Sequence, residues 1–267
     1  MFESTSHYGS KRKHHSQDNV DAKGQTRSRI LEEYLCTIST IRQHVIRGRT
    51  EILVKEDNRG TIIAKFRGFA VKIEHMKKKK HDETSKWNTI SKLKNARQYI
   101  NPLLLSFQEA HLHYNISELG TKDFFQHIID HRNNCTYDNN ILTHLYHALN
   151  AIEWLQHQGY IHRDIKMENF IFLNNTIKLI DFEFCLYAGN KQYVTTNCRA
   201  GTEPYLPPEL NKKRTGEPYK VYYTADSYSF AKSFLCTTQL IKQTHTQRQV
   251  YQHIFKPMLR LHPFSRA

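Results

Sequence analysis

The stretch IHRDIKMENF, residues 161–170, places six polar side chains of different chemistry between apolar ends. It brings a carboxylate, an ammonium, a guanidinium and an amide within a few residues of each other. It follows a predicted amphipathic helix over 141–157 and precedes a predicted hairpin, so it lies on a loop held by two rigid elements. Loops held in this way commonly carry reactive groups. The pattern favours a catalytic loop, and a solvated surface loop is the alternative.

Residues His162 to Asn169 match the pattern H-R-D-L-x-x-x-N with Ile for Leu, and here the chain resembles a eukaryotic-type protein kinase. A lysine two residues after the aspartate is the form seen in serine/threonine kinases. The resemblance implies that Asp164 accepts or orients the proton of the substrate hydroxyl and that Lys166 neutralises charge on the moving phosphoryl group. Asn169 would bind a magnesium ion. Arg163 would offer its fork to a phosphorylated activation-loop residue.

Two further motifs stand in the family's order. Asp181-Phe182-Glu183 ends the predicted strand TIKLI where the family has D-F-G, so the resemblance makes Asp181 a magnesium ligand. The stretch FAVKI resembles V-A-I-K and puts Lys72 where the family's lysine binds the α- and β-phosphates of ATP. The stretch INPLLLSFQEAHLHYNISELG resembles the strand pair that leads to the hinge. It places Glu118 near the adenine edge and Ser117 as a small gatekeeper.

The segment GTEPYLPPEL resembles the family's stretch that ends in A-P-E. Thr202 would hydrogen-bond near the catalytic loop and form the shelf for the acceptor residue. Asp226 in TADSYSFAKSF would brace the catalytic loop, and Arg266 would pair with Glu209. The stretch before this segment has the length of an activation segment. In it, Thr195 and Thr196 are candidate phosphorylation sites or ordinary loop threonines.

Three features depart from the family pattern. No G-x-G-x-x-G loop is visible, and only Gly48 or Gly60 stands in for it, Gly48 being the nucleotide-binding candidate. Side chains elsewhere in that loop would hold its backbone farther from the phosphates, which predicts weaker nucleotide affinity. The helical acid that should pair with the strand lysine is unclear, because Glu83 and Glu74 lie close to that lysine in sequence. Glu183 replaces a hinge glycine and adds a carboxylate beside the metal site.

The elements needed to position these groups give an α+β, bilobal kinase-like fold. A β-rich antiparallel meander precedes a mainly helical part, whose helices follow apolar residues at helical spacing. Asn174-Asn175 tolerates the left-handed backbone of a tight hairpin. The predicted elements are a meander over 45–75, a helix over 86–99, strands after Pro102, and helices over 141–157 and about 226–240.

The predicted domain plan has a basic, disordered tail over 1–29 and a kinase domain over 41–267. The tail is too poor in aliphatic residues to offset the entropy of ordering it. The N-lobe would span about 41–119 and the C-lobe about 120–267, truncated at its C-terminal end. This trimming resembles that of compact, divergent viral kinases, which is an analogy only.

Composition limits the compartment and the partners. The five cysteines are scattered and form no C-x-x-C pair, and no apolar stretch reaches membrane-spanning length. The sequence therefore predicts a cytoplasmic or nuclear protein that is not secreted and has no membrane partner. The net charge of +14 attracts polyanions. Nucleic acid is the less favoured partner, because no aromatic residues interleave with the basic run at 77–80.

The favoured reading is a serine/threonine protein kinase that uses ATP and Mg²⁺ and acts on protein substrates. The alternative is a pseudokinase that serves as a binding module. A small-molecule phosphotransferase is disfavoured, because such enzymes carry H-G-D rather than H-R-D. A zinc site at the histidine pairs His127/His131 and His144/His147 is disfavoured as well, because no third ligand stands at a recognisable spacing.

Overall fold

The computed structural model describes residues 43, 51–56, 61–66, 68–75, 83–131, 138–211 and 217–266, with only the backbone described at 51–56 and 138–139. The chain divides into two units, Met1–Thr50 and Glu51–Ala267, and every helix and strand described below belongs to the second. The predicted tail, the candidate Gly48 and the basic run at 77–80 lie outside the described residues.

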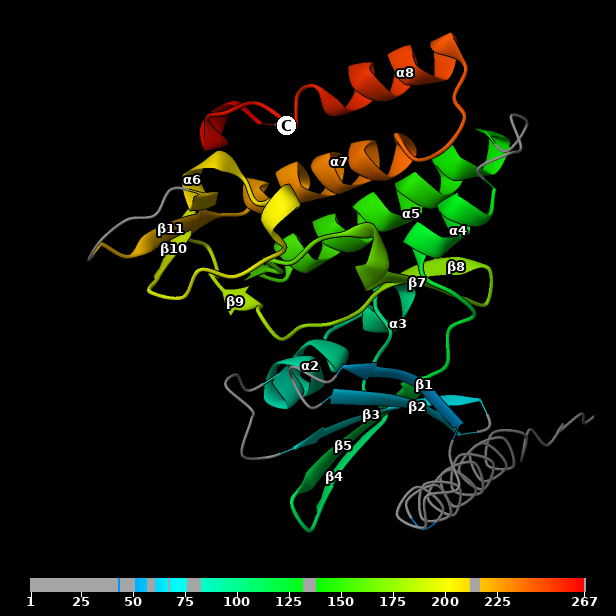
Figure 1. Ribbon diagram of the computed structural model, residues 1–267. Helices are drawn as coiled ribbons and strands as arrows, with labels where there is room; N and C mark the ends of the chain where they lie inside the picture. Colours follow the sequence, from blue (N-terminus) through cyan, green and yellow to red (C-terminus); the bar gives the residue numbers. More distant parts are fainter. Residues whose placement is uncertain are drawn as a thin grey trace, which may run out of the picture. The chain divides into compact units, whose positions relative to one another are not determined.

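A five-stranded antiparallel sheet forms the first layer, in the order β1-β2-β3-β5-β4 (Figure 1). Its strands are β1 (Glu51–Glu56), β2 (Thr61–Phe66), β3 (Phe69–His75), β4 (Leu105–Glu109) and β5 (Leu112–Glu118). The predicted meander is therefore confirmed over its described part. In the register, Lys72 of β3 lies opposite Ile63 of β2 and Asn115 of β5, so the lysine is on a central strand.

The helix predicted over 86–99 is wrong in its extent. The chain forms α2 (Glu83–Ser91) and the short α3 (Ala96–Tyr99) instead. Asn95 between them has φ 63°, a left-handed conformation that a continuous helix cannot include. Helix α2 buries Glu83, Trp87 and Ile90, which lie one turn apart on one face.

The second layer is mainly helical, as predicted. Figure 1 shows α7 between α5 and α8, on the side away from the sheet. The core shared by these helices is rich in phenylalanine, including Phe230, Phe234 and Phe255. Among the described residues, no helix combines the length and apolar character that crossing a bilayer requires. The helices are α4 (Phe124–Asp130), α5 (Asp138–His157), α6 (Pro208–Asn211), α7 (Thr224–Thr238) and α8 (His245–Phe255).

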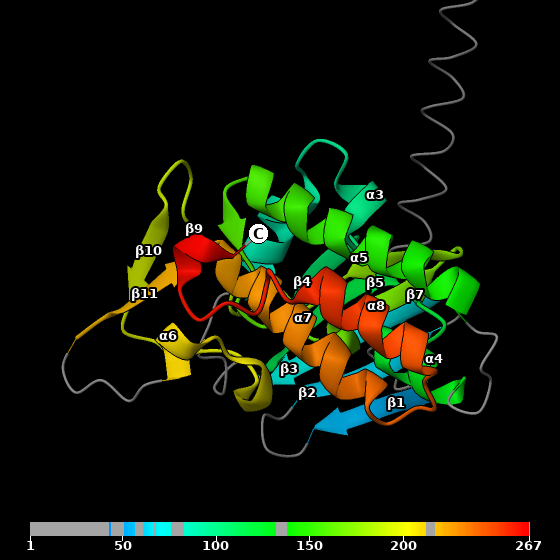
Figure 2. The same ribbon diagram turned by 90° about the horizontal axis from the view of Figure 1, so that it is seen from above.

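Three short antiparallel ribbons connect the helices. They are β6 (Tyr160–Ile161) with β9 (Leu186–Tyr187), β7 (Phe170–Leu173) with β8 (Thr176–Leu179), and β10 (Tyr193–Thr196) with β11 (Tyr219–Tyr222). Figure 2 shows the β10–β11 ribbon at the edge of the helical layer. The predicted hairpin is confirmed, because Asn174 and Asn175 have φ 50° and 60° between β7 and β8. Single 3₁₀ turns occur at Met167–Asn169, Glu203–Tyr205 and Pro263–Ser265.

Histidine rings fill part of the contact between α4, α5 and β7. The ring of His127 lies 5.0 Å from that of His144 and 4.3 Å from that of Phe172, between ring centroids. Burial, together with the neighbouring His144, His131 and Lys122, lowers the pKa of His127 to about 4. Burial is also the main cause of the lowered pKa of His144. Both rings are therefore neutral at physiological pH.

This packing predicts a loss of stability in acid. Because the pKa of His127 is lower in the folded chain than its ordinary value of 6.5, the unfolded chain binds more protons between these two values. The free energy of unfolding should therefore fall as the pH drops from 6.5 towards 4. We expect His127→Phe to flatten this dependence in urea titrations, and His253→Phe at an exposed site on α8 to leave it unchanged. The same pH dependence of the free energy of unfolding in the parent protein and both variants would contradict the lowered pKa of His127.

Candidate active site

A cavity of about 1040 Å³ lies between the sheet and the helical layer. Apolar side chains of both layers line it, among them Ile63 and Ala70 from the sheet and Ile171 from β7. The link from β5 to α4 forms one side through Leu119 and Gly120, which is where the boundary between the lobes was predicted. The cavity gathers five of the residues predicted from sequence, namely Lys72, Glu118, Lys166, Asn169 and Asp181.

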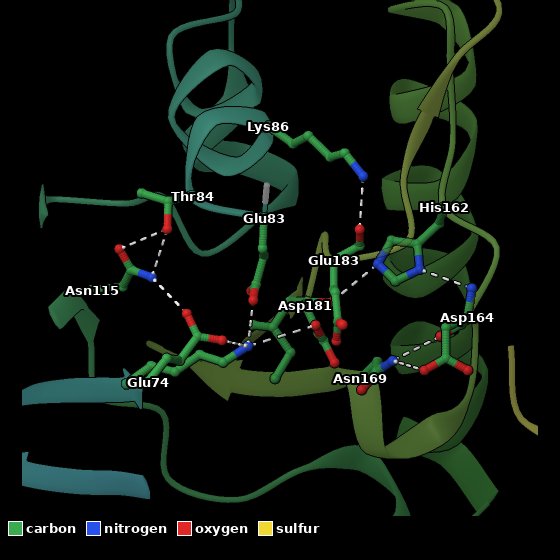
Figure 3. A network of polar contacts seen from close by, with 12 residues as sticks. Glu74, Glu83, Thr84, Lys86, Asn115, His162, Asp164, Asn169, Asp181 and Glu183 are labelled. Carbon is green, nitrogen blue, oxygen red and sulfur yellow. Dashed lines mark hydrogen bonds and ion pairs between the residues drawn. The ribbon is translucent and has the colours of Figure 1, made fainter. Parts of the chain in front are cut away.

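The ammonium of Lys72 lies among carboxylates from three segments. Its Nζ is 2.5 Å from Oε2 of Glu83, 3.7 Å from Oε1 of Glu74 and 3.9 Å from Oδ1 of Asp181. Figure 3 shows these three acids converging on one point. Burial by itself would lower the pKa of Lys72, but the three carboxylates outweigh burial and raise it. Lys72 is therefore a fixed positive charge that faces the cavity.

Glu83 is the helical acid that could not be assigned from the sequence. It is the first residue of α2 and is 2% exposed. Burial raises the pKa of its carboxyl group, and the ammonium of Lys72 opposes that rise. A sequence signal for this role existed, because Glu83, Trp87 and Ile90 have the spacing of one helix face. The helix was predicted to begin three residues later, which left the acid outside it.

The catalytic-loop backbone is held in an unfavourable conformation by Asp226. Arg163 has φ 74°, which costs a non-glycine residue roughly 1–2 kcal/mol. The amides of His162 and Arg163 donate to the two carboxylate oxygens of Asp226 at 2.7 and 2.8 Å. Asp226 is 1% exposed, and its carboxylate satisfies both amides. The predicted bracing role of Asp226 is therefore visible in the contacts.

Asp164 lies at the centre of the hydrogen bonds of this loop. Its Oδ1 accepts from the hydroxyl of Thr202 at 2.7 Å, and its Oδ2 lies 3.4 Å from Nζ of Lys166. The amide of Asn169 donates to the carbonyl oxygen of Asp164 at 2.7 Å. Lys166 also donates to Thr202 at 3.3 Å. The predicted pair, Asp164 and Lys166, therefore meets the predicted shelf residue.

Three aromatic rings in contact connect this loop to α2. The ring of Phe182 lies 5.6 Å from His162 and 6.5 Å from Trp87, between centroids. Phe182 is fully buried, whereas Asp181 before it has φ 67° and faces the cavity. Burying the phenylalanine therefore directs the neighbouring carboxylate towards Lys72.

The residues that would hold Mg²⁺ fit such an ion. Oδ1 of Asp181 is buried and has no hydrogen-bond partner among the described residues. Burying a carboxylate oxygen without a hydrogen-bond donor is costly, and a metal ion would compensate for that cost in addition to the ammonium of Lys72 at 3.9 Å. Asn169 lines the same cavity, and carboxylate and amide oxygens are the ligands that Mg²⁺ prefers. The described residues contain no group of three His, Cys, Asp or Glu side chains placed to hold a metal ion.

The segment after Asp181 is held mainly by backbone contacts. The guanidinium of Arg163 donates to the carbonyl oxygens of Phe184, at 3.4 Å, and of Cys198. Lys86 of α2 donates to the carbonyl oxygen of Glu183 at 2.7 Å. The fork predicted to receive a phosphorylated residue therefore binds main-chain carbonyls here. The candidate phosphorylation sites at 195–196 lie on β10 and remain predictions.

The far end of this segment is fixed by the predicted ion pair. Arg266 binds Glu209 through two parallel hydrogen bonds of 2.7 and 2.6 Å. The arginine side chain is fully buried and lies over the ring of Tyr228, 4.8 Å from its centroid. Such a bidentate pair fixes direction as well as distance.

Comparison with known proteins agrees with this geometry. Residues 58–263 match the family model described as the protein kinase domain. This match covers most of the chain, so the chain belongs to the protein kinase family. The matched range lies within the domain predicted over 41–267.

Curated relatives with similar sequences are kinases. An Aurora kinase of Yarrowia lipolytica is 32% identical over 127 residues, which is 47% of this chain and 33% of the relative. The serine/threonine-protein kinase CHK1 of Mycosarcoma maydis is 38% identical over 88 residues, which is 30% of this chain and 13% of the relative. The serine/threonine-protein kinase ste20 of Emericella nidulans is 30% identical over 139 residues, which is 45% of this chain and 16% of the relative. The chain thus spans a third or less of these relatives' lengths.

The buried ion pair gives a test of the architecture. Arg266→Ala leaves the carboxylate of Glu209 without its guanidinium, and losing one partner of a buried pair costs about 3–5 kcal/mol. We expect that loss in the free energy of unfolding from urea titration. Arg248→Ala, at an exposed position of α8, should change it by about 0.5 kcal/mol or less. Similar values for both variants would contradict the role given to the pair.

Proposed function

We propose that this protein is an active serine/threonine protein kinase that transfers the γ-phosphoryl group of ATP to protein hydroxyl groups. The observation that carries the proposal is the placement of Lys72 between Glu83 and Asp181, at 2.5 and 3.9 Å. It puts a fixed cation on one wall of the cavity and an acid able to bind metal on the other. Positioning of charge is most of what phosphoryl transfer requires from a protein.

The side chains divide the reaction between them. Lys72 would bind the α- and β-phosphates of ATP, and the backbone at Glu118 would lie beside its adenine ring. The hydroxyl of the substrate would approach Asp164, which accepts or orients its proton as the oxygen attacks phosphorus. Lys166 lies 3.4 Å from Oδ2 of Asp164 and would stabilise negative charge on the transferred group.

A divalent metal ion would accompany the phosphates in this reaction. Asn169 and Asp181 would hold Mg²⁺, which would neutralise the negative charge of the nucleotide when bound. Asn169 also donates to the backbone of Asp164, so one residue couples the metal site to the residue that orients the hydroxyl.

A pseudokinase is the second candidate, and the residue that favours it is Glu183. This carboxylate lines the cavity beside Asp181 in place of the family's glycine. Its charge would repel phosphate in the absence of a cation. The same charge would be compatible with catalysis if metal accompanies the nucleotide, which a direct assay can decide.

The decisive experiment measures transfer of radiolabelled phosphate from ATP·Mg²⁺ to a generic protein substrate. The full chain is compared with Asp164→Asn, which removes the proton acceptor and keeps the shape of the side chain. Loss of a general base typically costs about 100-fold or more in rate. We expect a fall of this size, and phosphoserine or phosphothreonine in the hydrolysed product.

Glu153→Gln is the matched control, because it makes the corresponding acid-to-amide change at an exposed position of α5. It should retain full activity, and both variants should melt at the temperature of the parent protein. Equal phosphate incorporation by the parent and Asp164→Asn would reject the active kinase. Specific binding of ATP without any incorporation would instead support the pseudokinase.

A further inference from the structure

A row of buried polar side chains lies between the sheet and α2. Asn115 is fully buried, and His113 is 8% exposed. The hydroxyl of Ser106 lies 2.8 Å from Nε2 of His113, whose Nδ1 lies 3.4 Å from the hydroxyl of Thr84. Polar groups are costly in an interior unless they are hydrogen-bonded to one another. A continuous polar row in this place therefore needs a physical reason.

The sheet register puts this row on the same face as the active-site lysine. Lys72 and Glu74 are two residues apart on β3, so their side chains point the same way. Asn115 lies directly opposite Lys72 and His113 directly opposite Glu74 on β5. Ser106 of β4 lies opposite Asn115 in turn. Three adjacent strands thus present polar groups towards α2.

Asn115 connects this row to the ion pairs of Lys72. Its amide nitrogen donates to the hydroxyl of Thr84 at 3.0 Å and lies 3.5 Å from Oε2 of Glu74. The other oxygen of Glu74 lies 3.7 Å from Nζ of Lys72. Figure 3 shows Asn115 between Thr84 and Glu74. One amide therefore links the first turn of α2 to a carboxylate that faces the lysine.

We propose that Glu74 and Asn115 are positioning residues for Lys72. Glu74 is a second carboxylate that holds the ammonium from its own strand, while Glu83 holds it from α2. Asn115 keeps Glu74 and Thr84 in register, so the strand and the helix stay aligned around one charge. Loss of Glu83 then leaves Lys72 with a carboxylate at 3.7 Å. The effect that we expect on the use of ATP rests on the proposed function. The role of these residues in holding the ammonium of Lys72 does not depend on that function.

The test measures how fast Lys72 reacts with acetic anhydride at about pH 9, with site-resolved mass spectrometry as the readout. Only the neutral amine reacts, so the rate follows the fraction of deprotonated lysine. Removing a charge at this distance lowers the pKa of a neighbouring ammonium by about one unit, which is about tenfold in rate. We expect Glu74→Gln to react about tenfold faster than the parent protein, relative to the exposed Lys92 in each sample.

Glu153→Gln is the matched control, since it makes the same chemical change at an exposed position of α5. It should leave the reactivity of Lys72 unchanged. In the background of Glu83→Gln, the additional Glu74→Gln change should raise the rate again by at least the same factor. Glu74→Gln is nearly isosteric, so it is interpretable alone should the Glu83 variants fail to fold. Reaction of Glu74→Gln at the rate of the parent protein would overturn the proposal.

Asn115→Leu tests the amide separately, because leucine fills a similar volume without hydrogen bonds. It should raise the reactivity of Lys72 severalfold and raise the KM for ATP more than it lowers kcat. A purely structural role would lower the melting temperature and leave both readouts at their parent values, which would reject the role of Asn115. If the parent protein transfers no phosphate, the proposed function fails while the labelling experiment still decides the present inference.

Discussion

A single ammonium, that of Lys72, has to be kept between carboxylates from separate parts of the chain. It is carried by a central strand, and the acids around it come from that strand, from the first residue of α2 and from the segment after β8. Burial removes water from this lysine, so it would lose part of the compensating attraction if any of these segments moved away. The position of α2 against the sheet and the direction of Asp181 are therefore coupled through one charge. The contacts of Lys72 with these carboxylates therefore determine part of the shape of the cavity.

The same coupling explains why strained backbone occurs in the site. Arg163 and Asp181 both have positive φ, and each is fixed by a neighbour that is deeply buried. Asp226 binds two consecutive amides, and Phe182 is enclosed by the rings of His162 and Trp87. Backbone strain of this kind persists only where several surrounding contacts hold the same conformation. The interior thus holds the loop and Asp181 in place, and Lys166, Asn169 and Asp181 line the cavity.

Local motifs made much of the site predictable from the sequence. Asp164, Lys166 and Asn169 lie within six residues, and Asp181 follows a strand whose pattern was clear, so the order of the motifs was enough to assign them. Glu83 was missed because its role depends on where a helix begins, and helix ends are poorly determined by periodicity alone. The buried row around Asn115 was not foreseen either. Polar residues in a strand are usually read as its solvated face, and only the register with β3 and α2 shows that this face is inside.

The segment from Asp181 to Glu209 shows what a motif cannot specify. Its end points were recognised, but the partners of Arg163 depend on how the chain folds back. The guanidinium reaches two carbonyl oxygens that lie fourteen residues apart, those of Phe184 and Cys198, so one side chain closes the segment into a loop. Pairing of β6 with β9 and of β10 with β11 holds the segment on either side of residues 188–192. The bidentate pair of Arg266 with Glu209 fixes the end that follows Thr202. Because backbone groups supply most of these contacts, the hydroxyl of Thr202 is placed against Asp164 by the path of the main chain as much as by its own hydrogen bond.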